Sequence, residues 1–180
     1  MTTADWALVI SILSAMISLV ALAWNVWSKF IYPKPSFVVT FSVANIWERN
    51  KVSAPFFSLS ITNHGPIPAT VTGSFARMGR GWFKRPELGF INPLSNFPHN
   101  LMHTQGPFSG GLPKKLEVGE EFSLKYWYGK NWMDEKPTAI GVRDTFGRFH
   151  WCSRTNIREA AKRYEKDKAD GKLPVDDEAM

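Results

Sequence analysis

An uninterrupted apolar run near the N-terminus constrains this chain more than any other feature. Residues 6–27 have the sequence WALVISILSAMISLVALAWNVW, without a charged side chain. As a helix this run would extend roughly 33 Å, close to the ~30 Å hydrocarbon core of a bilayer. Tryptophan lies at both ends, as in the aromatic belts of membrane interfaces. We therefore predict a short tail over residues 1–5 and one transmembrane helix with its interfacial flank over residues 6–32.

A cleaved signal peptide is the main alternative to a permanent anchor, because the Ala-Leu-Ala at residues 21–23 resembles a cleavage site. Signal peptides begin with positive charge, whereas the only charged side chain before the apolar run is Asp5. Lys29 and Lys34 follow the run, so the positive-inside rule places the rest of the chain in the cytoplasm.

Small and polar residues line one side of the predicted helix at alternating spacings of three and four. In lipid, helices associate through small residues and through hydroxyl or amide groups that bond across the contact. We interpret this stripe as a helix contact, made either with a second copy of the chain or with another membrane protein. The alternative is that Ser and Ala are simply common in membrane helices. The stripe residues are Ala7, Ser11, Ser14, Ser18, Ala21 and Asn25.

After Pro35 the apolar pattern changes to a period of two, which is typical of strands with one buried face. Eight Trp and thirteen Phe favour a sheet, since large rings suit half-buried strands. Alternating runs occupy residues 37–43, 57–62, 69–75, 122–128, 139–143 and 148–151, with turn sequences between them. The fold class we predict is mainly β: an antiparallel sandwich over residues 36–153, behind the single transmembrane helix.

Three sequence segments carry a resemblance to a known type of protein. They are Phe57-x-Leu-x-Ile-x-Asn-x-Gly-x-x-Pro-Ala, Leu112-Pro113…Leu116-x-x-Gly119-Glu120 and Val142-x-Asp144-x-x-Gly147-Arg148. Their order resembles immunoglobulin-like domains of small, single-helix, largely uncharacterised bacterial and phage membrane proteins. The resemblance covers most of residues 36–153 and implies an immunoglobulin-like sandwich in the bacterial inner membrane. It implies architecture and attaches no activity.

A long stretch over residues 79–112 is rich in Gly, Pro and Asn. Loops longer than about 15 residues are uncommon in compact domains and are often functional. Two interpretations stay open: the stretch holds one or two further strands that place its rings in the sandwich, or it forms a contact surface with the bilayer or a partner.

A cluster of cations and rings at the start of this stretch is the candidate anion-binding surface. The net charge of +6 suits lipid headgroups or nucleic acid equally. We favour headgroups over single-stranded nucleic acid, because a tethered domain already faces lipid. The alternative is a solvated basic turn with its rings turned inward. The cluster consists of Arg77, Arg80, Trp82, Phe83, Lys84 and Arg85.

The C-terminal part predicts an amphipathic basic helix over residues 154–170 and an acidic, disordered tail over residues 171–180. Asn156 and Glu159 have the spacing of a capping box, and Ile157, Ala160 and Tyr164 lie on one helix face. Gly171 is expected to end the helix.

The sequence offers no catalytic constellation. His99 and His103 are four residues apart, but they lie in a Pro-rich stretch without helix signals and without the Cys-x-x-Cys pairs of structural zinc sites. Asp144 precedes Thr-Phe-Gly, where a turn role is expected because Asp bonds its own backbone there. Cys152 is the single cysteine and has no partner for an intrachain disulfide. We expect no enzyme activity, cofactor or metal.

These features together predict a membrane-anchored binding or scaffold protein, an accessory component of a membrane assembly. Its expected partners are the lipid bilayer and a membrane protein or second copy that contacts the helix. The alternatives are an exported or cell-surface domain that recognises an external ligand, and an anchored nucleic-acid binder, which we do not favour.

Overall fold

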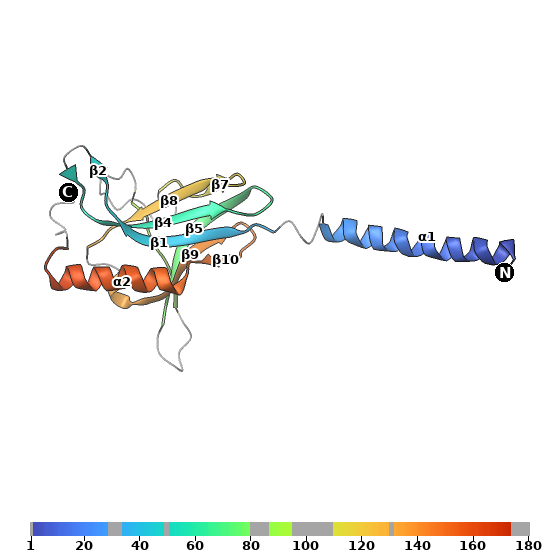
Figure 1. Ribbon diagram of the computed structural model, residues 1–180. Helices are drawn as coiled ribbons and strands as arrows, with labels where there is room; N and C mark the ends of the chain where they lie inside the picture. Colours follow the sequence, from blue (N-terminus) through green and yellow to red (C-terminus); the bar gives the residue numbers. More distant parts are fainter. Residues whose placement is uncertain are drawn as a thin grey trace. The chain divides into compact units, whose positions relative to one another are not determined.

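The computed structural model describes residues 2–28, 34–48, 51–79, 87–94, 110–129 and 132–173. The chain falls into two units, residues 1–34 and residues 35–180 (Figure 1). The first contains helix α1 (Thr3–Val26), and the second contains antiparallel sheets and helix α2 (Arg154–Ala169). The protein therefore belongs to the mixed helix-and-sheet class, whereas the sequence predicted a mainly β chain.

Helix α1 begins at Thr3, three residues before the predicted start. Thr2 caps it: the Thr2 hydroxyl accepts the backbone N–H of Asp5 (3.4 Å), and the Asp5 carboxylate accepts the backbone N–H of Thr2 (2.7 Å). This capping box satisfies two backbone donors and places an acid at the positive end of the helix dipole. Residues 3–5, expected in a tail, therefore belong to the helix.

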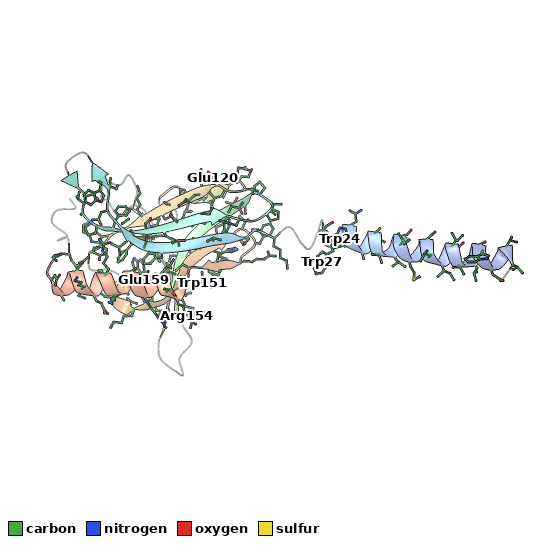
Figure 2. All side chains as sticks on the ribbon, viewed as in Figure 1. Trp24, Trp27, Glu120, Trp151, Arg154 and Glu159 are labelled. Atoms are coloured by element: carbon green, nitrogen blue, oxygen red, sulfur yellow. The ribbon has the colours of Figure 1, made fainter. Side chains whose placement is uncertain are left out.

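The length and composition of α1 are sufficient for it to cross a membrane. None of its described residues is buried, whereas a helix from the core of a soluble domain would be mostly covered. Trp24 and Trp27 lie near its C-terminal end (Figure 2) and are 71% and 52% exposed.

A three-stranded antiparallel sheet has the order β1-β4-β8. Its strands are β1 (Phe37–Ala44), β4 (Phe56–Asn63) and β8 (Glu121–Tyr126). Phe41, Leu59 and Leu124 are paired in one row across the sheet, and all three are buried. The predicted alternation of these strands is therefore confirmed.

A second antiparallel sheet has the order β10-β9-β5-β6, with β7 paired to the first part of β5. Its strands are β5 (Ala69–Met78), β6 (Glu87–Phe90), β7 (Lys114–Leu116), β9 (Pro137–Asp144) and β10 (Phe149–Trp151). A short hairpin of β2 (Trp47–Glu48) and β3 (Lys51–Val52) lies between β1 and β4 in the chain.

Strand β6 lies inside the stretch of residues 79–112 that the sequence left open between loop and strand. The described part of this stretch supports the first interpretation there, because β6 pairs with β5 and is followed by buried Ile91 and Leu94. A backbone N–H from Leu94 also donates to the carbonyl of Lys125 on β8 (2.7 Å). Residues 80–86 and 95–109 lie outside the described residues.

Both sheets and α2 share one hydrophobic core. Leu59 from the first sheet, Ile140 from the second and Tyr164 from α2 all belong to it. Helix α2 contacts β1 and β9, so it covers the core beside a strand of each sheet (Figure 1). Each fully buried aliphatic or aromatic side chain contributes about 1.5–3 kcal/mol.

Helix α2 begins two residues before Asn156, the predicted cap. Ser153 is the N-cap instead: its hydroxyl accepts the backbone N–H of Asn156 (3.2 Å) and donates to the Asn156 side chain (2.8 Å). At the other end Gly171 has φ 67° and donates to Lys168, while Lys172 donates to Asp167. This pair of backbone bonds is a Schellman motif, which requires the left-handed conformation that Gly tolerates.

Candidate binding surface

The six stripe residues lie on one side of α1, within about 40° of a common direction at 100° per residue. The Ser11 hydroxyl donates to the carbonyl of Ala7 (2.8 Å), and the Ser18 hydroxyl donates to the carbonyl of Ser14 (2.9 Å). Serine often bonds back to its own helix in this way. These two donors are therefore used within α1, and the stripe offers a neighbouring helix mainly its small size.

Arg77 is the member of the predicted basic and aromatic cluster that the structure describes. It is exposed on β5, opposite Leu88 of β6. The other cluster members lie outside the described residues: Arg80, Trp82, Phe83, Lys84 and Arg85. Arg77 also belongs to a second surface, on the outer side of the sheet that contains β5.

The outer side of the β10-β9-β5-β6 sheet is formed by alternate residues of each strand. Ala76, Ile140 and Val142 belong to the shared core, so the residues next to them on β5 and β9 point outward. The residues paired with these on β6 and β10 point the same way. We call this surface the aromatic face; its residues are Gly73, Phe75, Arg77, Leu88, Phe90, Ala139, Gly141, Arg143, Phe149 and Trp151.

Four rings on the aromatic face form a continuous chain of contacts. The centroids of Phe75 and Phe90 are 4.3 Å apart, and Phe149 meets Phe75 edge-on at 5.3 Å. Trp151 (Figure 2) stacks on Phe149 at 5.2 Å with nearly parallel planes. Phe75 is 4% exposed although it lies outside the shared core, whereas Phe90 is 59% exposed. The face therefore has a buried centre of its own with an exposed ring beside it.

Gly141 makes room for the end of this ring chain. A Cβ atom at Gly141 would lie 2.2 Å from the carbonyl oxygen of His150 and 2.9 Å from the Trp151 ring. Any side chain at this position would therefore push β10 away from β9. The close approach lets Trp151 lie over the strand opposite.

Two arginines lie on either side of the ring chain. Arg143 places its guanidinium over the Phe149 ring, 5.6 Å from the centroid, which is within the range of a cation–π contact. Arg77 lies two residues beyond Phe75 on β5. Among the described residues no carboxylate forms an ion pair with either guanidinium. The aromatic face is therefore apolar at its centre and positive at its edges.

Asp144 holds the turn that joins β9 and β10, two of the four strands of the aromatic face. Its carboxylate accepts the backbone N–H groups of Phe146 (2.8 Å) and Arg148 (2.9 Å), and it lies 3.0 Å from Nε2 of His150. Burial alone would raise the pKa of Asp144, but the hydrogen bonds from His150 and the two backbone groups outweigh it and lower the pKa. The predicted turn role of Asp144 is confirmed.

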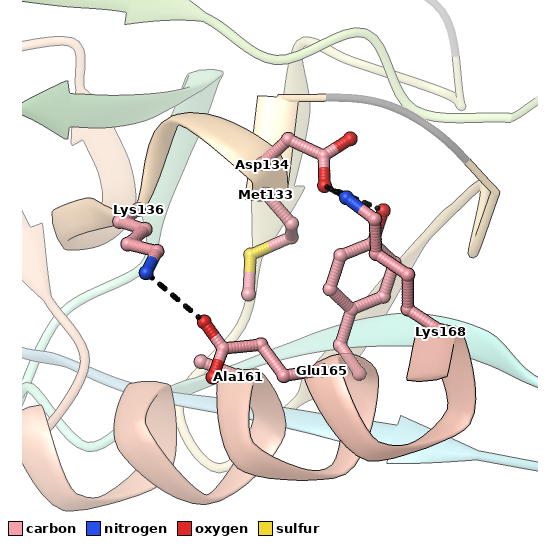
Figure 3. A pocket seen from close by; sticks show the side chains of 7 residues that line it. Met133, Asp134, Lys136, Ala161, Glu165 and Lys168 are labelled. Atoms are coloured by element: carbon pink, nitrogen blue, oxygen red, sulfur yellow. Dashed lines mark hydrogen bonds and ion pairs between the residues drawn. The ribbon is translucent and has the colours of Figure 1, made fainter. Parts of the chain in front are cut away.

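A pocket of about 230 Å³ lies between α2 and the short 3-10 helix η2 (Trp132–Glu135) (Figure 3). Ion pairs cross it: Lys168 to Asp134 at 2.5 Å and Lys136 to Glu165 at 3.3 Å. Burial and the Asp134 carboxylate raise the pKa of Tyr164 to about 12. The charged groups are thus engaged in holding η2 against α2.

Groups that could perform chemistry are not assembled within the described residues. These residues contain no cluster of three or more His, Cys, Asp or Glu that could hold a metal, and His99 and His103 lie outside them. Burial raises the pKa of Cys152 to about 11, so its thiol stays protonated near neutral pH.

The sequence identified β5, β9 and β10 of the aromatic face and left β6 open between loop and strand, and it missed the face itself. Phe149 and Trp151 alternate with His150, and this pattern alone indicates that one side of β10 is aromatic. The pattern does not indicate whether the rings point inward or outward. That depends on the register with β9, which places them opposite Arg143 and Gly141.

Neither a protein-family comparison nor a search of curated proteins or of solved structures found a significant match to this chain.

Proposed function

We propose that this chain is a single-pass membrane-anchored binding protein without catalytic activity, an accessory component of a membrane assembly. The observation that carries the proposal is the aromatic face, because rings and arginines occupy positions that water-facing strands usually fill with polar residues. Aromatic residues and Arg are the types enriched at protein interfaces. Helix α1 would confine this surface to a bilayer.

We propose an immunoglobulin-like sandwich for the domain. Naming β1, β4, β5, β8, β9 and β10 in chain order as A, B, C, E, F and G gives the sheets A-B-E and G-F-C. Immunoglobulin-like domains place strands A, B and E in one sheet and C, F and G in the other.

The proposed location is the bacterial inner membrane, with the domain in the cytoplasm. Lys29 and Lys34 follow the apolar run, whereas residues 1–5 contain no Lys or Arg. This difference in positive charge supports the orientation. Fusion of a reporter enzyme that is active only in the periplasm to the C-terminus tests this orientation. Reporter activity would show that the domain lies outside the cytoplasm. Carbonate washing of the same membranes tests the anchor, because a cleaved or soluble protein would be released.

The α1 stripe is proposed as a second contact, with another membrane helix or a second copy. Small residues allow close approach of helix backbones in lipid. Leucine at Ser14 or Ser18 would fill this space and weaken the association in a membrane two-hybrid assay. Leucine at Met16, away from the stripe, is the matched control.

Site-specific photo-cross-linking in intact membranes tests the binding surface. A photoreactive residue replaces Phe90 on the aromatic face or, as a control, Val38 on the outer side of the other sheet; both wild-type side chains are well exposed, at 59% and 48%. We expect a discrete cross-linked adduct from position 90 and none from position 38. Equal labelling at both positions, or none at position 90, would refute the proposal.

A further inference from the structure

We propose that the aromatic face selects a protein partner that presents two carboxylates on either side of an apolar centre. The inference rests on the proposed binding function and names the chemistry of its partner. Arg77 and Arg143 would bind the carboxylates, and Phe90 and Leu88 would be covered by the apolar centre.

Neither Arg77 nor Arg143 forms an ion pair with a carboxylate among the described residues. Arg143 stacks on Phe149, and this contact limits the directions in which its guanidinium can donate. A planar guanidinium suits a carboxylate through two parallel hydrogen bonds. Because the described outward positions of the face contain no acid, a carboxylate that binds these guanidinium groups would come from outside this surface.

The sheet register sets the spacing that a partner must match. Arg143 is paired with Gly73, which is four residues before Arg77 on β5. Four residues along a strand and one step across the sheet separate the two Cα atoms by about 14 Å. Phe75 lies between them, with Phe90 beside it on β6. A partner segment therefore needs two carboxylates within reach of guanidinium groups whose Cα atoms are about 14 Å apart, with apolar side chains in between.

The exposed apolar groups of the face lie on the same side of its edge strand. Phe90 and Leu88 are 59% and 44% exposed on the short edge strand β6. A buried ring already lies beside them at Phe75, so a partner would extend an existing apolar centre. Interfaces bury such centres and keep charges at the rim.

A second copy of the chain fits this surface less well than an acidic partner. Two faces packed around a twofold axis would bring four guanidinium groups together without an acid from the described face. Single-stranded nucleic acid also fits less well, because bases stack on free ring faces. Here Phe149 and Trp151 use their faces on each other.

Peptide selection on the full chain in detergent micelles tests the inference. A displayed random peptide library is selected on the immobilised protein, and one enriched peptide is synthesised with its acids intact or changed to amides. We expect enriched peptides to carry Asp or Glu around Leu, Phe or Trp. We expect the Arg77→Gln and Arg143→Gln variants each to weaken the acidic peptide about tenfold, and the amide peptide to bind both variants and wild type equally.

Arg158→Gln is the matched control, since Arg158 is exposed on α2 and the substitution removes the same charge. Unchanged thermal unfolding midpoints would show that the Arg77 and Arg143 variants keep the fold. Peptides without carboxylates that lose binding on Phe90→Ser but not on Arg143→Gln would overturn this inference and leave the proposed function standing. A library without any Phe90-dependent peptide would count against the proposed function itself.

Two further measurements on the same protein test whether a second copy of the chain or single-stranded nucleic acid binds the aromatic face instead. Cross-linking between copies through position 90, or retention of a labelled single-stranded oligonucleotide that Phe90→Ser abolishes, would each overturn the acidic-protein inference. Neither is expected at physiological ionic strength.

Discussion

The outer faces of the two sheets differ in chemistry although both belong to one domain. The β1-β4-β8 sheet presents hydroxyl groups over its three central rows, from Thr40, Ser42, Ser58, Ser60, Thr62 and Ser123, with Val38, Glu121 and Lys125 completing the rows. We call this the hydroxyl face. The aromatic face carries rings, glycines and two arginines on the equivalent outward positions.

The hydroxyl face is what an antiparallel sheet with one wet side requires. Its short polar groups bond to water and to each other, as Ser60 and Ser123 do at 2.8 Å. The aromatic face departs from that pattern, because its rings bury one another outside the shared core. Ser and Thr are under-represented among binding hot spots, and aromatic residues and Arg are enriched. The difference in outward side chains therefore supports the aromatic face, and not the hydroxyl face, as the proposed binding surface.

The largest effect is expected from removal of the buried ring of the aromatic face. Phe75→Ala should lower the free energy of unfolding by about 3 kcal/mol, because it leaves a cavity beneath Phe90 and Phe149. Phe90→Ala should cost only about 1 kcal/mol, since that ring is 59% exposed. Denaturant unfolding of the full chain in mild detergent measures both values. Equal costs would mean that the face has no packed centre of its own.

Crowding on the aromatic face is the next largest effect. Gly141→Ala should destabilise the chain by about 2 kcal/mol, because the added methyl group lies 2.2 Å from the His150 carbonyl oxygen. Gly89→Ala on β6 is the matched control, since a Cβ there meets nothing within 4 Å. Hydrogen exchange of the β10 amides should speed up in the first variant only. A neutral Gly141→Ala would contradict the close approach of β9 and β10.

Asp144 should stabilise the strand pair of the aromatic face in a pH-dependent way. Its pKa is lower in the folded chain, so the ionised carboxylate stabilises the fold above its ordinary value of 3.8, and this contribution is lost as pH falls below it. Asp144→Asn should therefore cost about 1–2 kcal/mol at pH 7, where it removes charge-assisted hydrogen bonds.

Unfolding midpoints of the wild type and the Asp144→Asn variant at pH 7 and pH 3 provide the measurement. The difference between the two proteins should shrink at pH 3, because below the ordinary pKa of 3.8 the carboxylate of the unfolded wild type takes up a proton and the unfolded chain is thereby stabilised. A difference that stays the same at both values would show that the charge of Asp144 plays no part.

Much of the architecture could be predicted from local patterns. The alternation around Phe41 and Leu59 predicted strands whose buried sides the structure confirms, and Gly171 marks the end of α2 as expected. The predicted start of α1 was three residues late, and the predicted cap of α2 was Asn156 instead of Ser153, although the start at residue 154 was right. Thr2 and Ser153 cap the helices through hydrogen bonds that depend on their backbone conformation.

The candidate surface was harder to predict because it is assembled from four strands. Phe75, Phe90 and Trp151 are up to 76 positions apart in the chain, and only the register of β5, β6, β9 and β10 places them in one row. Arg77 was singled out for its charge near other cations, whereas its described neighbours are Leu88 and Ala139. Sequence spacing carries no information on such cross-strand contacts.

The smallest effect is expected on the hydroxyl face. Ser60→Ala removes the hydrogen bond to Ser123, but both groups are exposed and water can replace it, so the free energy of unfolding should fall by about 0.5 kcal/mol or less. The same variant should bind the selected acidic peptide as wild type does. Denaturant unfolding and peptide titration of the full chain in mild detergent measure the two quantities. A large loss of peptide binding would show that the peptide binds the hydroxyl face. Loss of one exposed hydroxyl group cannot disturb the rings on the other side of the shared core without also lowering stability.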